Sequence, residues 1–581
     1  MNVLTDLLAK IYKRPEENKK FKVEKESLSV IIVVLFAILI RLILMHFRAN
    51  FLEYDEAYYI ILAKNLSIGK GYILNGLPHV NNFPLFPIMI GLFSFVISDL
   101  IWSSRIITAI AGGTVLIPIY YLIKGISQKK VAITVILFMS VMPCLISFAN
   151  FSTKYIDRIY FGAEHLFMLL LYLAIYFAWL SYKKDRVIFY IATGLFLGLA
   201  YLARFEAILY FMAILLFLIL NRIIFQKLSS LRKMIAGLLG IIISFIIIVA
   251  PLFIYLYKTT GHFTISGKAE VSSHLRDGVY AVLKYNDWSK FCQTLYDLDE
   301  SDERMKSILW GVEKENIVTN NRENMFSSLL KESLSLTPFN LCFFLTDSLK
   351  VILPLFLWPF FIIGVYSVIR DFSKWQDELF ILSVTFLPTL AIAFLSFPLP
   401  KYCLILVPLF SYYIARSVFF LCENINGKGK RRIFNIIIIS ELFMFLMTLT
   451  FKDISILILK NARPLSFHVA ELNNKMALEL KQRIPTGATI MSTHPSLALF
   501  SGGDWRVLPI APFDKIIHYA LFKKIDYIVF SRLGGYKPPS VRIFFAENNR
   551  YNFFILHLSG THKSFDDYQK EYEGHDYIIF K

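Results

Sequence analysis

The sequence predicts an all-α polytopic membrane protein of about eleven transmembrane helices, followed by a small C-terminal α/β domain. Three observations support this fold class. Of the 581 residues, 56% are hydrophobic and only 18% are charged, which gives a mean hydropathy of +0.56. The hydrophobic residues form successive runs, many of them long enough to cross a bilayer. The final segment, from about 452 to 581, has the mixed pattern of a soluble domain.

The first apolar run, "LSVIIVVLFAILIRLILMHF" (28–47), has about the 20 residues that a membrane-spanning helix needs. It follows a head of mixed charge, residues 1–27, and precedes no small-residue cleavage site. We therefore expect a retained helix rather than a removed signal peptide, with residues 1–27 in the cytoplasm.

Further apolar runs are centred near 84–98, 105–123, 131–150, 164–180, 187–203, 206–220, 234–257, 347–367, 379–397, 402–421 and 433–451. If all of them crossed the membrane, the loops rich in Lys and Arg would fall on contradictory sides. The positive-inside rule is satisfied when one early run does not span. The run 84–98 is short and opens with two prolines, so we expect it to lie in the interface.

Eleven crossings then place the N-terminus inside and the C-terminus outside. The predicted transmembrane domain covers residues 28–451 and has two large outer loops, 48–104 and 258–346. Residues 452–581 form the predicted extracytoplasmic α/β domain. The 258–346 loop, which contains "YAVLKYNDWSKF", is the expected cover over a pocket or acceptor surface.

The C-terminal segment alternates helix and strand patterns. "HVAELNNKMALELKQRI" and "FDKIIHYALFKKI" are typical of amphipathic helices, and "ATIMST", "DYIVFS" and "DYIIFK" are typical of strands. The sequence predicts a small α/β domain here, and no function can be read from it.

The formal net charge is +18, carried by basic residues in short loops between apolar runs. In such loops Lys and Arg set topology and face anionic lipid. Membrane lipids are therefore the expected partners of these charges, and nucleic acid is not.

Charged residues from separate parts of the chain gather at the predicted outer face. A carboxylate with cations at this place suits a reaction in which an acceptor is deprotonated while an anionic leaving group is held. The residues are Asp55, Glu56, Asp157, Arg158, Glu164, Arg204, Glu206 and Lys401.

Each of these residues also has a purely structural interpretation. Asp55, Glu56 and Glu164 could stabilise helix N-termini, where acidic side chains contribute roughly 0.3 to 1 kcal/mol. Arg204 and Glu206 could form a local ion pair that closes a hairpin. A further alternative makes the remaining cations anchors that snorkel to the interface.

Four short segments together resemble a known family of membrane enzymes. They are "YDEAYYIILAKNLSIGKGY", "RIITAIAGG", "YFGAEHLF" and "ATGLFLGLAYLARFEAIL". Their order and spacing are similar to polytopic glycosyltransferases of the GT-C fold, in the branch of the dolichyl-phosphate-mannose protein mannosyltransferases, the aminoarabinose transferases and the rhizobial lipopolysaccharide sugar transferases. The resemblance covers roughly residues 28–257 and, more weakly, "PKYCLILVPL" near residue 400.

This resemblance implies transfer of a hexose or pentose from a polyprenyl-phosphate donor to a lipid, glycan or protein acceptor outside the cytoplasm, usually with inversion. It implies a catalytic carboxylate at Asp55, with Glu56 beside it, and a second acidic residue at Glu164. We expect Asp55 to act as general base on the acceptor hydroxyl, and Glu164 to position donor or acceptor.

The donor phosphate needs positive charge as it leaves. Arg204 and Lys401, together with Arg158, are the cations that we expect to bind it. No residue pattern demands a metal, so no cofactor is assigned, although two carboxylates can hold a divalent cation.

The alternative function is a transporter or flippase of lipid-linked saccharides. Such proteins commonly have two related halves and charges near the middle of the membrane, and neither is evident here. A structural membrane protein would leave the four segments unexplained. We expect a bacterial plasma membrane, with the endoplasmic reticulum as the alternative.

Overall fold

The structure is a computed structural model. It describes residues 25–47, 52, 54–146, 162–225, 231–267, 296–307, 309, 311–312, 338, 340–342, 344–371, 375–395, 400–423, 427–458, 465–533, 537–558, 568–575 and 577–581.

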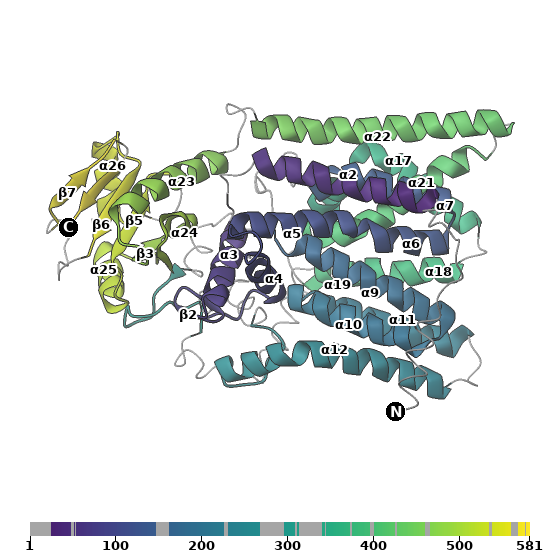
Figure 1. The fold of residues 1–581 in the computed structure, drawn as a ribbon, viewed down its shortest axis with the longest axis horizontal. Helices are drawn as coiled ribbons and strands as arrows, with labels where there is room; N and C mark the ends of the chain where they lie inside the picture. The colour runs from purple at the N-terminus through teal and green to yellow at the C-terminus, as the bar shows by residue number, and fades with distance from the viewer. Residues whose placement is uncertain are drawn as a thin grey trace, which may run out of the picture.

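A bundle of long helices forms one part of the molecule, and a small domain with a sheet lies at one end of it (Figure 1). The helices before that domain are α2 (Lys25–Phe47), α3 (Tyr54–Ser67), α4 (Leu85–Phe93), α5 (Leu100–Thr114), α6 (Leu116–Ile126), α7 (Lys129–Val141), α8 (Pro143–Ile146), α9 (Glu164–Lys184), α10 (Val187–Ala203), α11 (Ala207–Phe225), α12 (Leu231–Thr260), α16 (Leu349–Ile352), α17 (Trp358–Arg370), α18 (Trp375–Ile381), α19 (Leu387–Leu395), α20 (Pro400–Cys403), α21 (Val407–Leu421) and α22 (Lys428–Ile458).

Eight of the described helices are long and apolar enough to cross a membrane, or nine if the bent pair Asn340–Ile352 and Leu355–Arg370 counts as one span. These spans correspond to nine of the eleven predicted crossings. The other two predicted runs are also helical, as α10 and as α7 followed by α8, but they are shorter. The predicted fold class, a polytopic helical membrane protein, is confirmed.

Some helix boundaries differ from the sequence prediction. The run 84–98 forms only the nine-residue helix α4, about 14 Å long and far short of the roughly 30 Å of hydrocarbon. Helix α5 begins at Leu100 instead of 105, because Asp99 caps it by accepting from the backbone N–H groups of Ile101 and Trp102. Helix α22 continues past residue 451 to Ile458, because no helix-breaking residue follows the apolar run.

The short basic loops meet at the end of the bundle opposite the sheet domain (Figure 1). Arg222 pairs with Asp185 at 2.7 Å, and Lys183 pairs with Asp377 at 2.7 Å. A cavity of about 440 Å³ lies where the α6–α7 loop, the end of α17 and the start of α22 come together. Loops that the positive-inside rule assigned to one side of the membrane therefore lie at one end of the bundle.

The C-terminal domain contains a six-stranded mixed sheet in the order β4-β3-β5-β6-β8-β7. Strands β3, β4 and β5 pair in parallel, β6 is antiparallel to β5, and β8 is parallel to β6. Its elements are α23 (Leu465–Arg483), β3 (Thr489–Ser492), α24 (Ser496–Ser501), β4 (Asp504–Val507), α25 (Phe513–Phe522), β5 (Tyr527–Ser531), α26 (Pro539–Glu547), β6 (Phe553–His557), β7 (Lys570–Glu573) and β8 (Tyr577–Phe580). The predicted helices and strands are all present, and the sequence missed β4, β6, β7, α24 and α26.

Helix α3 and the hairpin of β1 (Ile73–Leu74) and β2 (Leu77–Pro78) lie between the bundle and this domain (Figure 1). Ile61, Leu62 and Leu74 belong to the hydrophobic core of the C-terminal domain, while Ala63 packs into the core of the bundle. Helix α3 is thus buried on two sides, and its orientation depends on both parts of the molecule.

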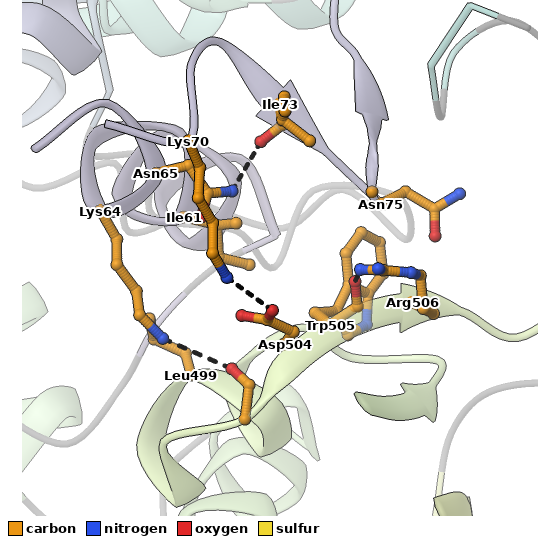
Figure 2. A pocket seen from close by; sticks show the side chains of 12 residues that line it. Ile61, Lys64, Asn65, Lys70, Ile73, Asn75, Leu499, Asp504, Trp505 and Arg506 are labelled. Atoms are coloured by element: carbon orange, nitrogen blue, oxygen red, sulfur yellow. Dashed lines mark hydrogen bonds and ion pairs between the residues drawn. The ribbon is translucent and has the colours of Figure 1, made fainter. Parts of the chain in front are cut away.

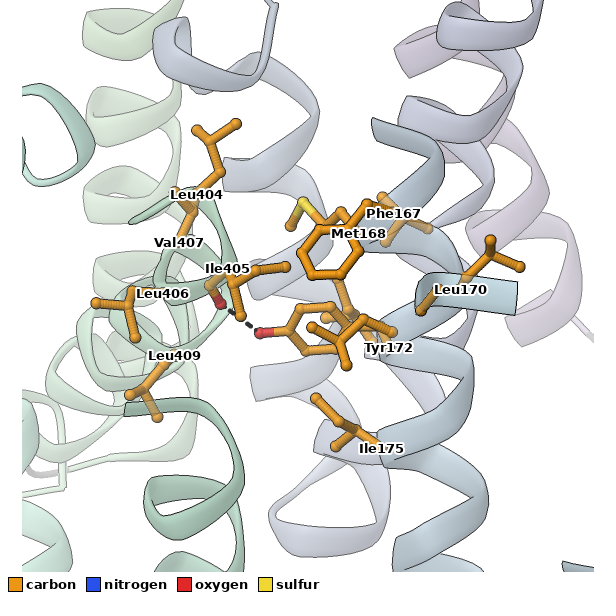
Figure 3. Close-up of a cluster of buried hydrophobic side chains, with 14 of the residues drawn as sticks. Phe167, Met168, Leu170, Tyr172, Ile175, Leu404, Ile405, Leu406, Val407 and Leu409 are labelled. Carbon is orange, nitrogen blue, oxygen red and sulfur yellow. Dashed lines mark hydrogen bonds between the residues drawn. The ribbon is translucent and has the colours of Figure 1, made fainter. Parts of the chain in front are cut away.

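Helices α9 and α21 bring two distant segments together. The short 3-10 helix η9 (Leu404–Leu406), which leads into α21, packs near the start of α9, and the Tyr172 hydroxyl of α9 donates to the carbonyl of Ile405 at 2.7 Å (Figure 3). This contact lies about two turns inside α9 and just before the start of α21. Glu164, the first residue of α9, is therefore held near Lys401, which immediately precedes this segment.

Close packing of α10 on α12 gives a direct test of the bundle. A Cβ on Gly194 would lie 2.1 Å from Ser244 Oγ and 2.2 Å from the carbonyl oxygen of Ile241, whereas a Cβ on Gly240 would meet nothing closer than 3.4 Å. Gly194→Ala should cost about 1 to 3 kcal/mol, because overpacking forces the helices apart. Gly240→Ala is the matched control and should be neutral or stabilising, since alanine favours helix. Thermal unfolding in detergent measures both, and equal midpoints would contradict this interface.

Candidate active site

Asp55 lies in the first turn of α3 and pairs with Lys401 of α20. The distance from Asp55 Oδ2 to Lys401 Nζ is 3.1 Å. The two side chains differ in exposure, 44% for Asp55 and 12% for Lys401. The carboxylate is thus accessible from solvent, while the ammonium approaches it from the protein side.

Arg204 lies between two carboxylates in the turn that joins α10 to α11. Its Nη1 donates to Glu164 Oε1 at 2.5 Å, and its Nε and Nη2 donate to the two oxygens of Glu206 at 3.2 and 3.3 Å. All three side chains are buried. Burial acts to lower the pKa of Arg204, but the charges of Glu206 and Glu164 outweigh it and hold that pKa above its usual value. Arg204 is therefore a permanent cation held between two carboxyl groups.

Tyr402 connects these two groups of charges. The Arg204 guanidinium carbon lies 5.0 Å from the centre of the Tyr402 ring, and Lys401 Nζ lies 5.8 Å from it. Both distances are within the range of a cation–π contact. The Asp55–Lys401 pair and the Arg204 cluster are consequently neighbours in one site.

Tyr59 lies one helical turn after Asp55, on the same face of α3. Burial raises the pKa of Tyr59, and the negative charge of Glu164 raises it further. Arg204 and Lys401 act on the same hydroxyl in the opposite sense. The phenol is therefore a neutral hydrogen-bond donor within the electrostatic reach of both charge groups.

Glu164 keeps one carboxylate oxygen for another partner. Oε1 accepts from Arg204, while Oε2 is buried and has no hydrogen-bond partner among the described residues. A Cβ at position 162 would come within 2.6 Å of Oε2, so Gly162 leaves space beside this oxygen. A buried carboxylate oxygen left without a donor is energetically costly unless a ligand supplies one.

Glu56 does not join this site. Its carboxylate is 1% exposed and pairs with Arg105 of α5, whose Nε lies 3.3 Å from Glu56 Oε1. Neighbouring residues on a helix are separated by about 100° around the axis, so an inward Glu56 is compatible with an accessible Asp55. The acidic pair therefore divides between the bundle interior and the open site.

Of the six predicted site residues, the structure brings together Asp55, Glu164, Arg204 and Lys401. Glu56 lies apart from them, and Arg158 falls outside the described residues. The predicted local ion pair of Arg204 with Glu206 is also present, as part of the larger cluster.

Sequence reasoning missed three residues around the site, Arg105, Tyr59 and Tyr402. A lone arginine within the apolar segment of α5 was an available signal for Arg105. Tyr402 stands in "PKYCLILVPL", a segment of the resemblance, whereas Tyr59 had no signal because aromatic residues make up 16% of the chain. Within the described ranges, no group of three or more His, Cys, Asp or Glu side chains is placed to hold a metal ion.

Comparisons with known proteins agree with this architecture. The family model of the dolichyl-phosphate-mannose-protein mannosyltransferases matches residues 80–255. No curated protein sequence matches the chain significantly. The apo oligosaccharyltransferase of Archaeoglobus fulgidus is similar with a TM-score of 0.56 and 12% identity, over 88% of this chain and 70% of that one.

Two ligand-bound structures are also similar. The archaeal oligosaccharyltransferase AglB from Archaeoglobus fulgidus, in complex with an inhibitory peptide and a dolichol-phosphate, has a TM-score of 0.51 and 12% identity, over 88% of this chain and 70% of that one. ArnT from Cupriavidus metallidurans, bound to undecaprenyl phosphate, has a TM-score of 0.48 and 12% identity, over 89% of this chain and 94% of that one. The chain has the GT-C fold, which it shares with the oligosaccharyltransferase of Archaeoglobus fulgidus, and its residues 80–255 resemble the dolichyl-phosphate-mannose-protein mannosyltransferases.

Proposed function

We propose that this protein is a membrane glycosyltransferase that moves a sugar from a polyprenyl-phosphate donor to a hydroxyl of a lipid, glycan or protein. The observation that carries the proposal is the Asp55–Lys401 pair beside the buried Arg204 cluster. Asp55 supplies a proton acceptor, Lys401 supplies a cation, and Glu164 supplies a carboxylate oxygen without a hydrogen-bond donor among the described residues. Displacement at an anomeric carbon uses groups of these kinds.

Asp55 is the general base of this reaction. Its accessible carboxylate accepts the proton of the acceptor hydroxyl, and the acceptor oxygen then forms a bond to the anomeric carbon of the donor. The bond from that carbon to the phosphate oxygen breaks, and polyprenyl phosphate leaves with the electron pair. A single displacement of this kind inverts the anomeric configuration.

Lys401 stabilises the leaving phosphate. We assign this role to Lys401 rather than to Arg204, because Arg204 is already compensated by two carboxylates. When Asp55 takes the proton it loses its negative charge, and the attraction between Asp55 and Lys401 weakens. The ammonium is then attracted more strongly to the phosphate as negative charge develops there, so deprotonation and departure assist each other.

Glu164 binds the donor or acceptor sugar through Oε2, the oxygen that no described residue satisfies. A sugar hydroxyl is the kind of donor that it lacks. Tyr59, neutral and close by, donates a hydrogen bond to the same sugar. Arg204 holds Glu164 in this orientation.

Glu56 is a positioning residue. Its buried pair with Arg105 fixes the rotation of α3 about its own axis, and thereby the direction in which Asp55 points. Neither group of this pair touches substrate in the mechanism.

The site belongs on the extracytoplasmic face of the membrane. It lies near the C-terminal domain, at the end of the bundle away from the basic loops, and the positive-inside rule puts those loops in the cytoplasm (Figure 1). We propose the plasma membrane of a bacterium as the location, with the endoplasmic reticulum as the alternative. The reaction as written needs no metal, and a divalent cation at the site stays a prediction.

Asp55→Asn tests the general base. The amide cannot take a proton at neutral pH, so turnover should fall by about 10² to 10⁴. The measurement is transfer of radiolabelled sugar from a panel of polyprenyl-phosphate sugars to cell-envelope extract, with purified protein in nanodiscs. Asp99→Asn is the matched control. It makes the same change of side chain at the N-cap of α5, where asparagine also caps a helix, so turnover should stay at the wild-type level. Wild-type turnover in a folded Asp55→Asn protein would refute the role.

Lys401→Met tests the phosphate contact. Loss of one well-placed charge should lower turnover about 100-fold or more, and Lys401→Arg should restore part of it. Lys350→Met, an exposed lysine of α16, serves as the control and should leave turnover unchanged. Full activity of Lys401→Met would show that the phosphate is bound elsewhere.

The Glu56–Arg105 pair gives a stability test. Glu56→Leu removes one partner of a buried ion pair and should cost about 3 to 5 kcal/mol, whereas the double variant Glu56→Leu/Arg105→Met should recover most of that loss. Thermal unfolding in detergent measures both variants. The rescued double variant should also turn over substrate. A stable double variant without activity would instead place Glu56 in the chemistry.

A further inference from the structure

A second cavity lies between α3 and the C-terminal domain. Its volume is about 230 Å³, enough for one sugar ring but too small for a folded peptide or a lipid tail. Helix α3 and the β1–β2 hairpin form one wall, and β4 with the end of α24 forms the other (Figure 2). The cavity exists only because the two parts of the molecule meet here.

The lining of this cavity carries an excess of positive charge. Three cations face one carboxylate, and that carboxylate, Asp504, is already paired with Lys70 at 2.8 Å (Figure 2). Among the described residues, the one hydrogen bond of Lys64 Nζ goes to the backbone oxygen of Gly503, at 3.4 Å. Among the described residues no carboxylate lies within ion-pair distance of Lys64 or Arg506. Two positive charges are therefore available to an anionic ligand.

Arg506 is the cation most in need of a partner. Its side chain is largely buried, and its one hydrogen bond among the described residues goes from Nη1 to the carbonyl of Trp505 at 2.9 Å. Burial lowers the pKa of Arg506, and the charge of Asp504 only partly offsets this effect. A guanidinium withdrawn from water in this way is stabilised by a bound anion.

The hairpin is shaped around this guanidinium. Gly76 has a φ of +77°, which favours glycine, and a Cβ there would come within 2.6 Å of Arg506 Nη2. Next to it, Asn75 accepts a hydrogen bond from the backbone N–H of Val507 at 2.9 Å. These contacts hold the hairpin wall of the cavity in place, and none of them neutralises the charge of Arg506.

The position of the cavity relates it to the acceptor. Asp55 and Lys64 are nine residues apart on α3, which corresponds to about 14 Å along the helix axis. This distance is longer than one sugar ring. A unit bound in the cavity would belong to the same saccharide as the reacting hydroxyl at Asp55 but would not be the sugar that reacts.

We propose that this cavity binds a negatively charged sugar unit, one that bears a carboxylate or a phosphate, within an acceptor glycan. The proposal rests on the proposed function, and it selects a glycan from the three acceptor classes. Arg506 and Lys64 bind the anionic group, and the Lys70–Asp504 pair supplies donors and acceptors for ring hydroxyls.

The test is equilibrium binding of small probes to the full chain in nanodiscs of zwitterionic lipid. The probes are glucuronic acid, glucose 6-phosphate, glucose and inorganic phosphate. The two anionic sugars should bind at least about 10-fold more tightly than glucose or phosphate, because only they satisfy both the cations and the hydroxyl partners. Their affinity should fall as salt is raised.

Arg506→Gln should weaken binding of the anionic sugars about 10- to 100-fold. Lys64→Gln should weaken it as well, which keeps the test informative if Arg506→Gln does not fold. Arg542→Gln, an exposed arginine of α26 in the same domain, is the matched control and should bind as wild type. Equal binding in wild type, Arg506→Gln and Lys64→Gln would overturn the proposal.

The probe panel distinguishes other outcomes. Phosphate that binds as tightly as the anionic sugars would overturn the sugar assignment and leave a simple anion site. Asp55→Asn should keep full binding, because the cavity is separate from the reacting groups. Sugar transfer without probe binding would refute the assignment of the cavity as a binding site for an anionic sugar, and would leave the proposed function standing. Probe binding without any sugar transfer would refute the proposed function alone.

Discussion

The fixed rotation of α3 is the constraint on which the site depends. Glu56 is held inside the bundle by Arg105, Ile61 and Leu62 are held in the core of the C-terminal domain, and Asp55 is left between these two attachments. A short helix outside the membrane would otherwise have few contacts to define its orientation. Two adjacent acidic residues thus have different tasks, one in a buried ion pair and the other at an open surface.

The electrostatics of the site follow from a similar division. Arg204 pairs with Glu164 and with Glu206, so it holds both buried carboxyl groups in place. Lys401 has a more accessible partner in Asp55, so the strength of this contact changes when Asp55 changes its charge. Burial therefore separates the ion pairs that are shielded from solvent from the one pair whose carboxylate is accessible.

Hydrophobicity and loop charge predicted the bundle well, because a bilayer imposes strict rules on both. Every predicted apolar run contains helix within its described residues, and the helix in the run 84–98 is too short to span. The C-terminal strands were predicted less completely: β4 and β6 were missed because short strands in a mixed sheet have no distinct periodicity.

The candidate site was predicted in part for a similar reason. Acidic and basic residues are scarce near apolar runs, so Asp55, Glu164, Arg204 and Lys401 were conspicuous in the sequence. Their partners were not, since tyrosines are common and the pairing of Glu56 with Arg105 joins segments 49 residues apart. Which carboxylate turns inward depends on the packing of α3, and no local pattern encodes it.

Helix α22 has a consequence for the reach of the protein. It has 31 residues and is therefore about 46 Å long, compared with about 30 Å for the hydrocarbon layer. Large apolar side chains such as Ile433 and Met444 are exposed along it, as expected for a helix that faces lipid. The helix is therefore about 16 Å longer than the hydrocarbon layer is thick, so part of it must lie outside that layer if it crosses the bilayer upright.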